Sequence, residues 1–157
     1  MIRSEVERRV DEVLVFRLGT VGYEEGCRLQ ERLAAARAAG VFQDSLLLLQ
    51  HPPVITIGRG GGEEDILAPA SVLQQAGVRV FRTDRGGRTT YHGPGQLVAY
   101  PILRWAQGDL HEYARRLEEV AIRVLRAYGL EAGRIDRYPG VWVNGRKIAA
   151  IGVAVRD

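Results

Sequence analysis

The sequence predicts an α+β fold, in which helices and short strands combine in one domain that spans residues 1–157. Three observations support this prediction. The chain is 46% hydrophobic and 26% charged, a composition typical of a globular domain with one core. Residues 23–39 and 109–128 have the apolar periodicity of amphipathic helices. Between and after them lie apolar runs too short for helices, and the last two flank an Asn-Gly pair.

The first half of the chain alternates predicted strands with predicted helices. Its short apolar runs predict strands at residues 13–18, 46–49, 54–57 and 78–82. Residues 23–39 form the first predicted helix, which Gly40 ends, and residues 69–76 form a short helix with a proline in its first turn. Pro52 and Pro53 force an extended bend between the second and third strands.

The second half begins with a predicted strand at residues 97–103. Pro101 interrupts this run, which places the strand at a sheet edge or at a bulge. Residues 109–128 follow as the strongest helical pattern of the chain. Asp109 and Glu112 are spaced as an acidic variant of the capping box, which predicts the start of the helix.

A β-hairpin is predicted near the end of the chain. Residues 140–143 and 146–155 are apolar runs joined by Asn144 and Gly145, the strongest short hairpin signal. A two-residue turn places Trp142 opposite Lys147, which is the only lysine in the sequence. A second strand that continues to residue 155 would put Lys147 at the head of an apolar row.

Two interpretations of Lys147 follow from this hairpin. Packing against an apolar row would remove water from the ammonium group, and desolvation disfavours the charged form of an amine, which suits the lysine to serve as an acid and a base. Alternatively, a lysine one position past a turn extends its ammonium group into water. The hairpin pattern alone leaves both interpretations open.

The most polar and glycine-rich passage of the chain is residues 83–96, which is predicted to be a loop. Its glycines allow a ligand to approach the backbone closely, and its arginines, threonines, tyrosine and histidine supply hydrogen-bond donors. The pattern is neither the dinucleotide fingerprint nor a phosphate-binding P-loop. A carbonyl, carboxylate or phosphate group suits such a loop, although a glycine turn with incidental polar residues is the structural alternative.

Three sequence blocks together resemble a known family. The blocks are Gln50-His51-Pro52-Pro53-Val54 with Ile57-Gly58-Arg59, then Arg85-Gly86-Gly87 through Thr90-Tyr91-His92-Gly93-Pro94-Gly95-Gln96 with Tyr100-Pro101, and Pro139-Gly140-Val141-Trp142-Val143 leading to Lys147-Ile148-Ala149-Ala150-Ile151-Gly152. In order and spacing they closely resemble the octanoyltransferases of lipoate biosynthesis, the lipoyl(octanoyl) transferase family. The resemblance covers nearly the whole chain.

The resemblance implies a fold and a reaction. The implied fold is that of the biotin and lipoate protein ligases, a mixed and largely antiparallel sheet with flanking helices. The implied reaction transfers octanoyl from octanoyl-acyl carrier protein to a specific lysine of lipoyl domains of 2-oxoacid dehydrogenases or of the glycine-cleavage H protein. It passes through an acyl-cysteine thioester and uses no ATP, metal or other cofactor.

The resemblance also implies which residues form the site. The lysine that matches Lys147 activates the nucleophilic cysteine, so Lys147 is the expected catalytic residue. Two segments match the substrate-binding positions of the family, and their residues are Arg85, Gly86, Gly87, Arg88, Thr89, Thr90, Tyr91, His92, Ala150, Ile151 and Gly152. We favour a structural or substrate-orienting role for His92 over proton transfer.

One departure from the family concerns the nucleophile. The nucleophilic cysteine of the family lies downstream of the lysine in a Pro-Cys-Gly turn, whereas these residues end at Asp157. Cys27 is the only cysteine, and it matches no motif residue, so we interpret it as a half-buried small side chain of the first helix. We therefore expect that the natural protein continues beyond these residues and exceeds their 17.4 kDa.

The amino-acid composition limits the possible functions of the protein. A formal charge of +3 is too small to indicate a nucleic-acid partner, and no apolar run is long enough to cross a membrane. A charged start of the chain and a single cysteine predict a cytoplasmic protein. Two other functions remain as alternatives, an ATP-dependent lipoate or biotin protein ligase and a non-catalytic module that binds acyl chains or carrier proteins.

Overall fold

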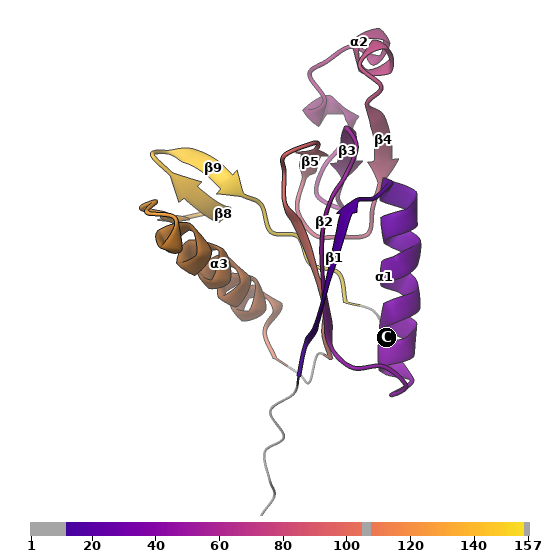
Figure 1. Ribbon diagram of the computed structural model, residues 1–157. Coiled ribbons are helices and arrows are strands. Elements are labelled where there is room, and N and C mark those ends of the chain that lie inside the picture. The colour runs from indigo at the N-terminus through magenta and orange to yellow at the C-terminus, as the bar shows by residue number, and fades with distance from the viewer. Residues whose placement is uncertain (1–11, 105–107, 156–157) are drawn as a thin grey trace, which may run out of the picture. The chain divides into compact units, whose positions relative to one another are not determined.

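The computed structural model describes residues 12–104 and 108–155, which form two compact units. The first unit contains β1 (Leu14–Thr20), α1 (Tyr23–Ala38), β2 (Ser45–Gln50) and β6 (Val98–Ile102). The second contains β3 (Val54–Ile57), a 3₁₀ turn (Glu63–Asp65), α2 (Ala70–Gln75), β4 (Arg79–Arg82), β5 (Thr89–His92), α3 (Leu110–Ala127), β7 (Gly133–Ile135), β8 (Tyr138–Val143) and β9 (Arg146–Ala149) (Figure 1).

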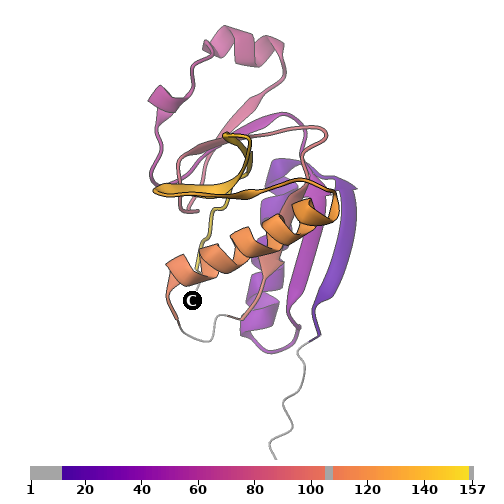
Figure 2. The ribbon, with the colours of Figure 1, turned by 90° about the vertical axis from the view of Figure 1, so that its left-hand side faces the viewer.

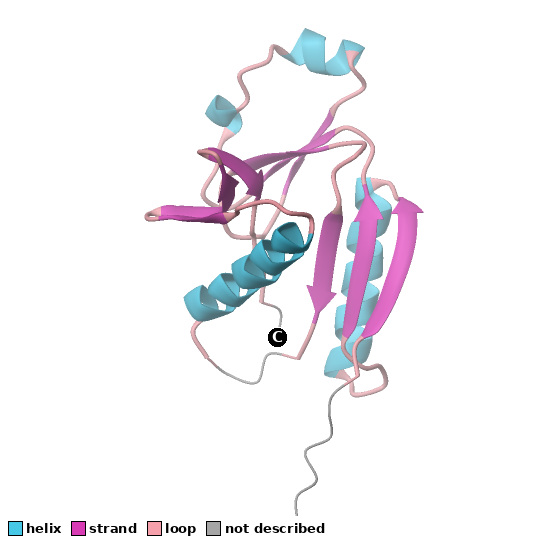
Figure 3. Cartoon of the chain, turned by 60° about the vertical axis from the view of Figure 1, so that its left-hand side comes forward, coloured by secondary structure: helices cyan, strands magenta, loops and turns pink. Residues whose placement is uncertain are grey.

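The first unit is a three-stranded sheet covered by one helix. Its strand order is β1-β2-β6, with β1 parallel and β6 antiparallel to β2. Burial alternates along β2, as the two-residue period of a strand requires, and Leu47 and Leu49 are almost completely buried. α1 runs along one face of this sheet (Figure 3), and its Leu29 and Leu33 pack against the buried leucines.

The second unit contains two three-stranded sheets. In β4-β3-β5 the central strand is parallel to β4 and antiparallel to β5, and β7-β8-β9 is antiparallel throughout. α3 lies beside the β7-β8-β9 sheet (Figure 2) and packs against β8. Val141 of β8 and Ile122 of α3 are buried, so each side contributes apolar surface to the core of this unit.

The predicted fold class is confirmed. Four of the six strand pairings in the described residues are antiparallel, and helices flank the sheets. Pro101 lies on β6, an edge strand of its sheet, as its missing N–H predicts. The hairpin turn is also confirmed, because Asn144 and Gly145 have φ values of 49° and 72°, and Trp142 pairs with Lys147.

Two strand predictions are wrong. Residues 83–96 are not a continuous loop, because Thr89–His92 form β5 beside β3. Threonine and tyrosine favour strands, but the surrounding glycines obscured this short run. β9 ends at Ala149 instead of residue 155, because the backbone beyond it leaves the sheet and the carbonyl oxygen of Val153 accepts a hydrogen bond from Gly86 N–H at 2.9 Å.

Two smaller features also differ from the sequence analysis. Asp109 caps α3 by accepting a hydrogen bond from His111 N–H at 2.9 Å, but the Glu112 carboxylate pairs with Arg116 instead of completing the capping box. The short strand β7 was not predicted, because three residues carry too little periodicity. Among the described helices, none has the length and apolar character needed to cross a membrane.

Candidate functional site

Three glycine-rich segments of the second unit are held together by backbone hydrogen bonds. After β3, Arg59 N–H donates to Arg85 O and Gly60 N–H donates to Gly87 O, both at 3.0 Å. On the other side of the 85–88 loop, Gly86 N–H donates to Val153 O at 2.9 Å. The loop between β4 and β5 is therefore fixed from both sides by segments that are distant in the sequence.

Two glycines are required by the closeness of these segments. A Cβ atom on Gly58 would lie 2.5 Å from Gly87 O and 2.7 Å from a guanidinium nitrogen of Arg85. A Cβ atom on Gly152 would lie 3.0 Å from both Gly86 O and Arg85 Cδ. The sequence places glycine at both positions because the neighbouring backbone and the Arg85 side chain leave no room for a methyl group.

Arg85 acts as an internal brace of this loop. Its guanidinium donates to the carbonyl oxygen of Thr56 at 2.9 Å, to Thr56 Oγ1 at 2.7 Å and to Gly86 O at 3.0 Å. Thr56 is completely buried on β3, and its hydroxyl also lies 3.3 Å from His92 Nε2. Arg85 and His92 therefore meet at one buried hydroxyl inside the second unit.

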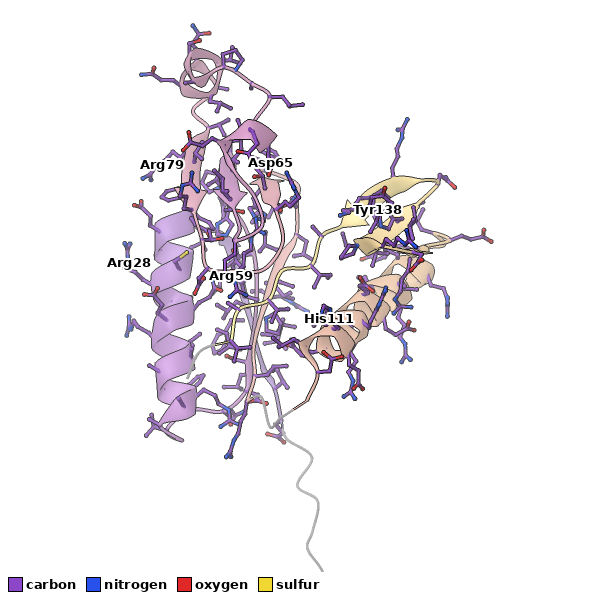
Figure 4. The ribbon with its side chains drawn as sticks, turned by 180° about the vertical axis from the view of Figure 1, so that it is seen from behind. Arg28, Arg59, Asp65, Arg79, His111 and Tyr138 are labelled. Carbon is purple, nitrogen blue, oxygen red and sulfur yellow. The ribbon has the colours of Figure 1, made fainter. Side chains whose placement is uncertain are left out.

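A second polar cluster surrounds Asp65 (Figure 4). Its carboxylate pairs with Arg88 and accepts hydrogen bonds from Thr89 Oγ1 at 3.0 Å and from Gly62 N–H at 3.2 Å. The hydrogen bond from Arg88 is the main cause that holds the pKa of Asp65 below its usual value, and the same bond raises the pKa of Arg88. Both groups are charged at neutral pH.

These residues border a pocket of about 510 Å³ within the second unit, a size suited to a small ligand. Its lining combines an apolar wall with a polar border, and the lining residues are Ile55, Asp65, Ile66, Leu67, Ala68, Arg88, Thr89, Tyr91 and Lys147. Arg88, Thr89, Tyr91 and Lys147 belong to the predicted site, and the structure brings them together. The arrangement suits an apolar chain that ends in a polar group.

Lys147 lies on β9 with an exposed side chain, and its Nζ atom is 5.0 Å from the centroid of the Trp142 ring. The prediction that it heads an apolar row is wrong, because β9 ends at Ala149 and the pairing of β8 with β9 shifts register between Val141 and Trp142. The ammonium group thus reaches solvent, as in the alternative interpretation. It still borders the pocket.

The other predicted site residues take different positions. Thr90 lies on β5, where its carbonyl oxygen accepts a hydrogen bond from Thr56 Oγ1 at 3.4 Å. Gly87 has a φ of 86°, and a Cβ atom there would be 4.0 Å from Ile151 O. Ala150, Ile151 and Gly152 follow β9 without regular secondary structure and outside the pocket lining, and Ile151 and Gly152 lie near the 85–88 loop.

Five residues of the pocket lining were not predicted from the sequence, and Asp65 and Ile55 are two of them. Asp65 follows a glycine run and a pair of glutamates, so its acidic neighbours gave no reason to select it. Ile55 alternates with the buried Val54 and Thr56 along β3, and this alternation is the signal that places it on the pocket face. Asp65 and Ile55 reach the pocket only through the tertiary structure, which a sequence pattern does not show.

The other two histidines have structural positions. His51 is completely buried in the first unit, where its ring nitrogens lie 2.7 Å from Val21 O and 2.9 Å from the Tyr100 hydroxyl. Burial lowers the pKa of His51 and outweighs the opposing effect of the hydrogen bond to Val21 O. His111 is exposed on the first turn of α3 (Figure 4). Among the described residues, no cluster of acidic, histidine or cysteine side chains could hold a metal ion.

Comparisons with known proteins agree with this architecture. Residues 22–157 match the family described as the lipoyl protein ligase A/B catalytic domain. The chain is 54% identical over 138 residues to an octanoyltransferase of Solibacter usitatus and 52% identical over 151 residues to an octanoyltransferase of Rubrobacter xylanophilus. These alignments cover 87% and 95% of this chain, and 63% and 68% of the respective relatives.

Solved structures of the same fold are more distant in sequence. A lipoate-protein ligase A bound with ATP superimposes with a TM-score of 0.65 at 19% identity, over 93% of this chain and 62% of that chain. A bi-partite lipoate protein ligase from Thermoplasma acidophilum, described together with its E2 lipoyl domain, gives 0.62 at 22% identity, over 85% and 52%. These likenesses concern the fold.

Proposed function

Because the chain belongs to the family of the lipoyl protein ligase A/B catalytic domain, we propose that the protein transfers octanoyl groups in lipoate biosynthesis. The proposed donor is octanoyl-acyl carrier protein, and the proposed acceptor is a specific lysine of lipoyl domains or of the glycine-cleavage H protein. The observation that carries this proposal is the identity of about half of all aligned residues to two octanoyltransferases.

The pocket supports the proposal through its chemistry. Ile55, Ile66 and Leu67 line one part of this open pocket, which offers apolar contact to a saturated acyl chain, and each CH₂ group that becomes buried there would contribute about 0.8 kcal/mol. Arg88 and Lys147 border the same space, so a polar thioester end has donors within reach. Asp65 pairs with Arg88 and so holds it at the border.

The proposed chemistry has two steps. A cysteine thiolate attacks the octanoyl thioester, so that a new carbon–sulfur bond forms and the carrier thiol leaves with a proton. The acceptor lysine then attacks the enzyme thioester, an amide forms, and the cysteine thiol is released. Lys147 is the proposed acid and base of these steps, because a lysine ammonium can donate a proton and the neutral amine can accept one.

Cys27 is not assigned the nucleophilic role. It is half-buried on α1 and matches no motif residue of the family. We propose instead that the natural protein supplies a cysteine beyond Asp157. A natural protein of 17.4 kDa without such a cysteine would contradict this part of the proposal.

The test is transfer of octanoyl from its carrier protein to an isolated lipoyl domain by the natural protein, followed by mass spectrometry of the acceptor. Lys147→Arg keeps the positive charge but cannot release a proton, so we expect it to slow transfer by about 10²-fold or more. Arg146→Ala, at the neighbouring exposed position of β9, is the matched control with an unchanged rate. An absolute requirement for ATP in this assay would favour the ligase alternative.

A further inference from the structure

Glu118 is an acidic residue whose side chain is almost completely buried in the second unit. It lies on α3, and only 2% of its side chain is exposed. Burial of a carboxylate is costly unless hydrogen bonds and opposite charges replace its water. The partners of Glu118 therefore indicate what this residue holds in place.

The Glu118 carboxylate connects α3 to two strands. Its Oε1 atom accepts a hydrogen bond from Gly140 N–H of β8 at 2.8 Å. Its Oε2 atom accepts hydrogen bonds from Arg134 of β7 at 2.9 Å and from Arg115 at 3.0 Å. Burial alone would raise the pKa of Glu118, but these three donors lower it below its usual value, so the group is a carboxylate at neutral pH.

Gly140 lies between this carboxylate and Lys147. Its φ is 114°, a conformation that favours glycine, and a Cβ atom there would lie 2.5 Å from Ala149 O and 3.3 Å from Lys147 Cε. The methylene chain of Lys147 thus runs directly over the backbone of Gly140. Any movement of Gly140 changes the surface on which the lysine rests.

Trp142 supports the other end of the same side chain. The ammonium nitrogen of Lys147 lies 5.0 Å from the Trp142 ring centroid, within the range of a cation–π contact. The Trp142 indole is itself fixed, since its N–H donates to Tyr138 O at 3.1 Å and its ring packs edge-on against that of Tyr138. Two residues of β8, Gly140 and Trp142, therefore determine where Lys147 lies.

We propose that Glu118 is a positioning residue for Lys147. Its carboxylate accepts a hydrogen bond from Gly140 N–H and so fixes the part of β8 against which the methylene chain of Lys147 packs. This contact directs the ammonium group of Lys147 to the border of the pocket. The effect of this positioning on catalysis rests on the proposed function, because it requires that Lys147 takes part in octanoyl transfer. The positioning itself can be measured without the reaction.

The measurement uses the fact that Lys147 is the only lysine of these 157 residues. Reductive methylation with ¹³C-formaldehyde places labelled methyl groups on its Nζ atom and keeps the positive charge. Because Nζ lies over the Trp142 ring, the methyl proton resonance is expected to show an upfield ring-current shift. Trp142→Leu removes the ring and defines the position of the unshifted resonance.

Two conservative variants distinguish the effect of the side-chain length of Glu118 from the effect of its charge. Glu118→Asp keeps the charge but withdraws the carboxylate by one methylene from Gly140 N–H, so we expect it to lose most of the ring-current shift. Glu118→Gln keeps the length of the side chain and an oxygen that can accept the hydrogen bond from Gly140 N–H, so we expect this variant to retain the ring-current shift. Each variant is first compared with the parent protein by circular dichroism to establish that it folds.

Glu119→Ala is the matched control. Glu119 is the next residue on α3 and also pairs with Arg134, at 3.1 Å, but its carboxylate contacts the arginines Arg123 and Arg134 and not Gly140. We expect the full shift in this variant. In the transfer assay Glu118→Asp should be slower by about 10-fold to 100-fold, as for displacement of a reacting group by about 1 Å, and Glu119→Ala should not.

Two results would overturn the inference. These are a folded Glu118→Asp protein with the parent shift, and an equal loss of shift in Glu119→Ala. Failure of the proposed function looks different, because then Lys147→Arg transfers at the parent rate, or no transfer occurs, while the ring-current shift still responds to Glu118→Asp.

Discussion

Single charged residues of the second unit contribute mainly by holding backbone. The Arg85 guanidinium donates hydrogen bonds to the carbonyl oxygens of Thr56 and Gly86, and the Glu118 carboxylate accepts a hydrogen bond from Gly140 N–H. Each charged side chain forms hydrogen bonds with backbone peptide groups that are part-buried or buried. A hydrogen bond that involves a charged group is stronger than one between two neutral groups. Their substitution is therefore expected to alter the position of neighbouring segments as well as local charge.

The Glu118 carboxylate also makes stability depend on pH. Its pKa in the folded protein lies below the reference value of 4.5, so the unfolded chain binds the proton more readily. The stabilisation is therefore present above about pH 4.5 and is lost as pH falls through the folded pKa. We expect Glu118→Gln to lower the free energy of unfolding at neutral pH and to make it less dependent on pH in the acidic range.

Urea unfolding of both proteins between about pH 7 and about pH 3 measures this difference. The curves of unfolding free energy against pH should converge at the acidic end. Curves that stay parallel over the whole range would show that Glu118 does not lose stabilising interactions on protonation. Glu119 and Asp65 also have lowered pKa values, so some dependence on pH remains in the variant.

At the scale of elements, strands and helices were predictable wherever a periodic apolar pattern ran for several residues. α1, β2, β3 and α3 follow from such patterns to within about two residues, the usual uncertainty of element ends. β5 did not, because its four residues lie among glycines. The end of β9 did not either, because it depends on the Gly86 hydrogen bond to Val153 O, a contact between distant segments.

The candidate site was predictable in its residue types and less so in their roles. The glycine-rich segment pointed to residues 85–92, and four of the predicted residues do line the pocket. The pattern could not separate Arg85, which braces the loop, from Arg88, which borders the pocket. Glu118 carried no signal, because an acidic residue on an amphipathic helix is normally exposed.

The glycine-rich segments make a further prediction at this scale. Gly58→Ala would place a Cβ atom 2.5 Å from Gly87 O, and that backbone is held by its own hydrogen bonds. We expect a loss of about 1–3 kcal/mol in the free energy of unfolding, as for other overpacked sites, together with slower transfer. Urea unfolding and the transfer assay provide the two measurements.

Gly133→Ala serves as the comparison for this substitution. A Cβ atom on Gly133 of β7 would meet no atom within 4 Å, so the added methyl group should cost little. Equal stability losses in the two variants would mean that general glycine effects, and not the close approach of Gly58 to Gly87, determine the result.

For the whole molecule, the composition of the chain provides an unusually simple chemical probe of the pocket. Lys147 is the only lysine of these residues, it is exposed, and it borders the pocket. An amine-reactive ester should therefore modify one ε-amino group. If the pocket holds the acyl chain, octanoate should slow this modification by covering Lys147, whereas acetate at the same concentration should not.

Peptide mapping by mass spectrometry measures the rate at Lys147, and the α-amino group of the chain serves as the internal reference. Equal rates with octanoate and with acetate would argue against this pocket as the acyl site. Slowing at both amines would indicate a general effect of the additive on the reagent.

The contact between Gly86 and Val153 has a consequence for synthesis of the protein. Gly86 leaves the ribosome long before Val153, and their hydrogen bond at 2.9 Å fixes one side of the 85–88 loop. Contacts between residues so far apart in sequence form late, because a long loop must close first. This side of the 85–88 loop therefore stays unsupported in the nascent chain until Val153 has been translated.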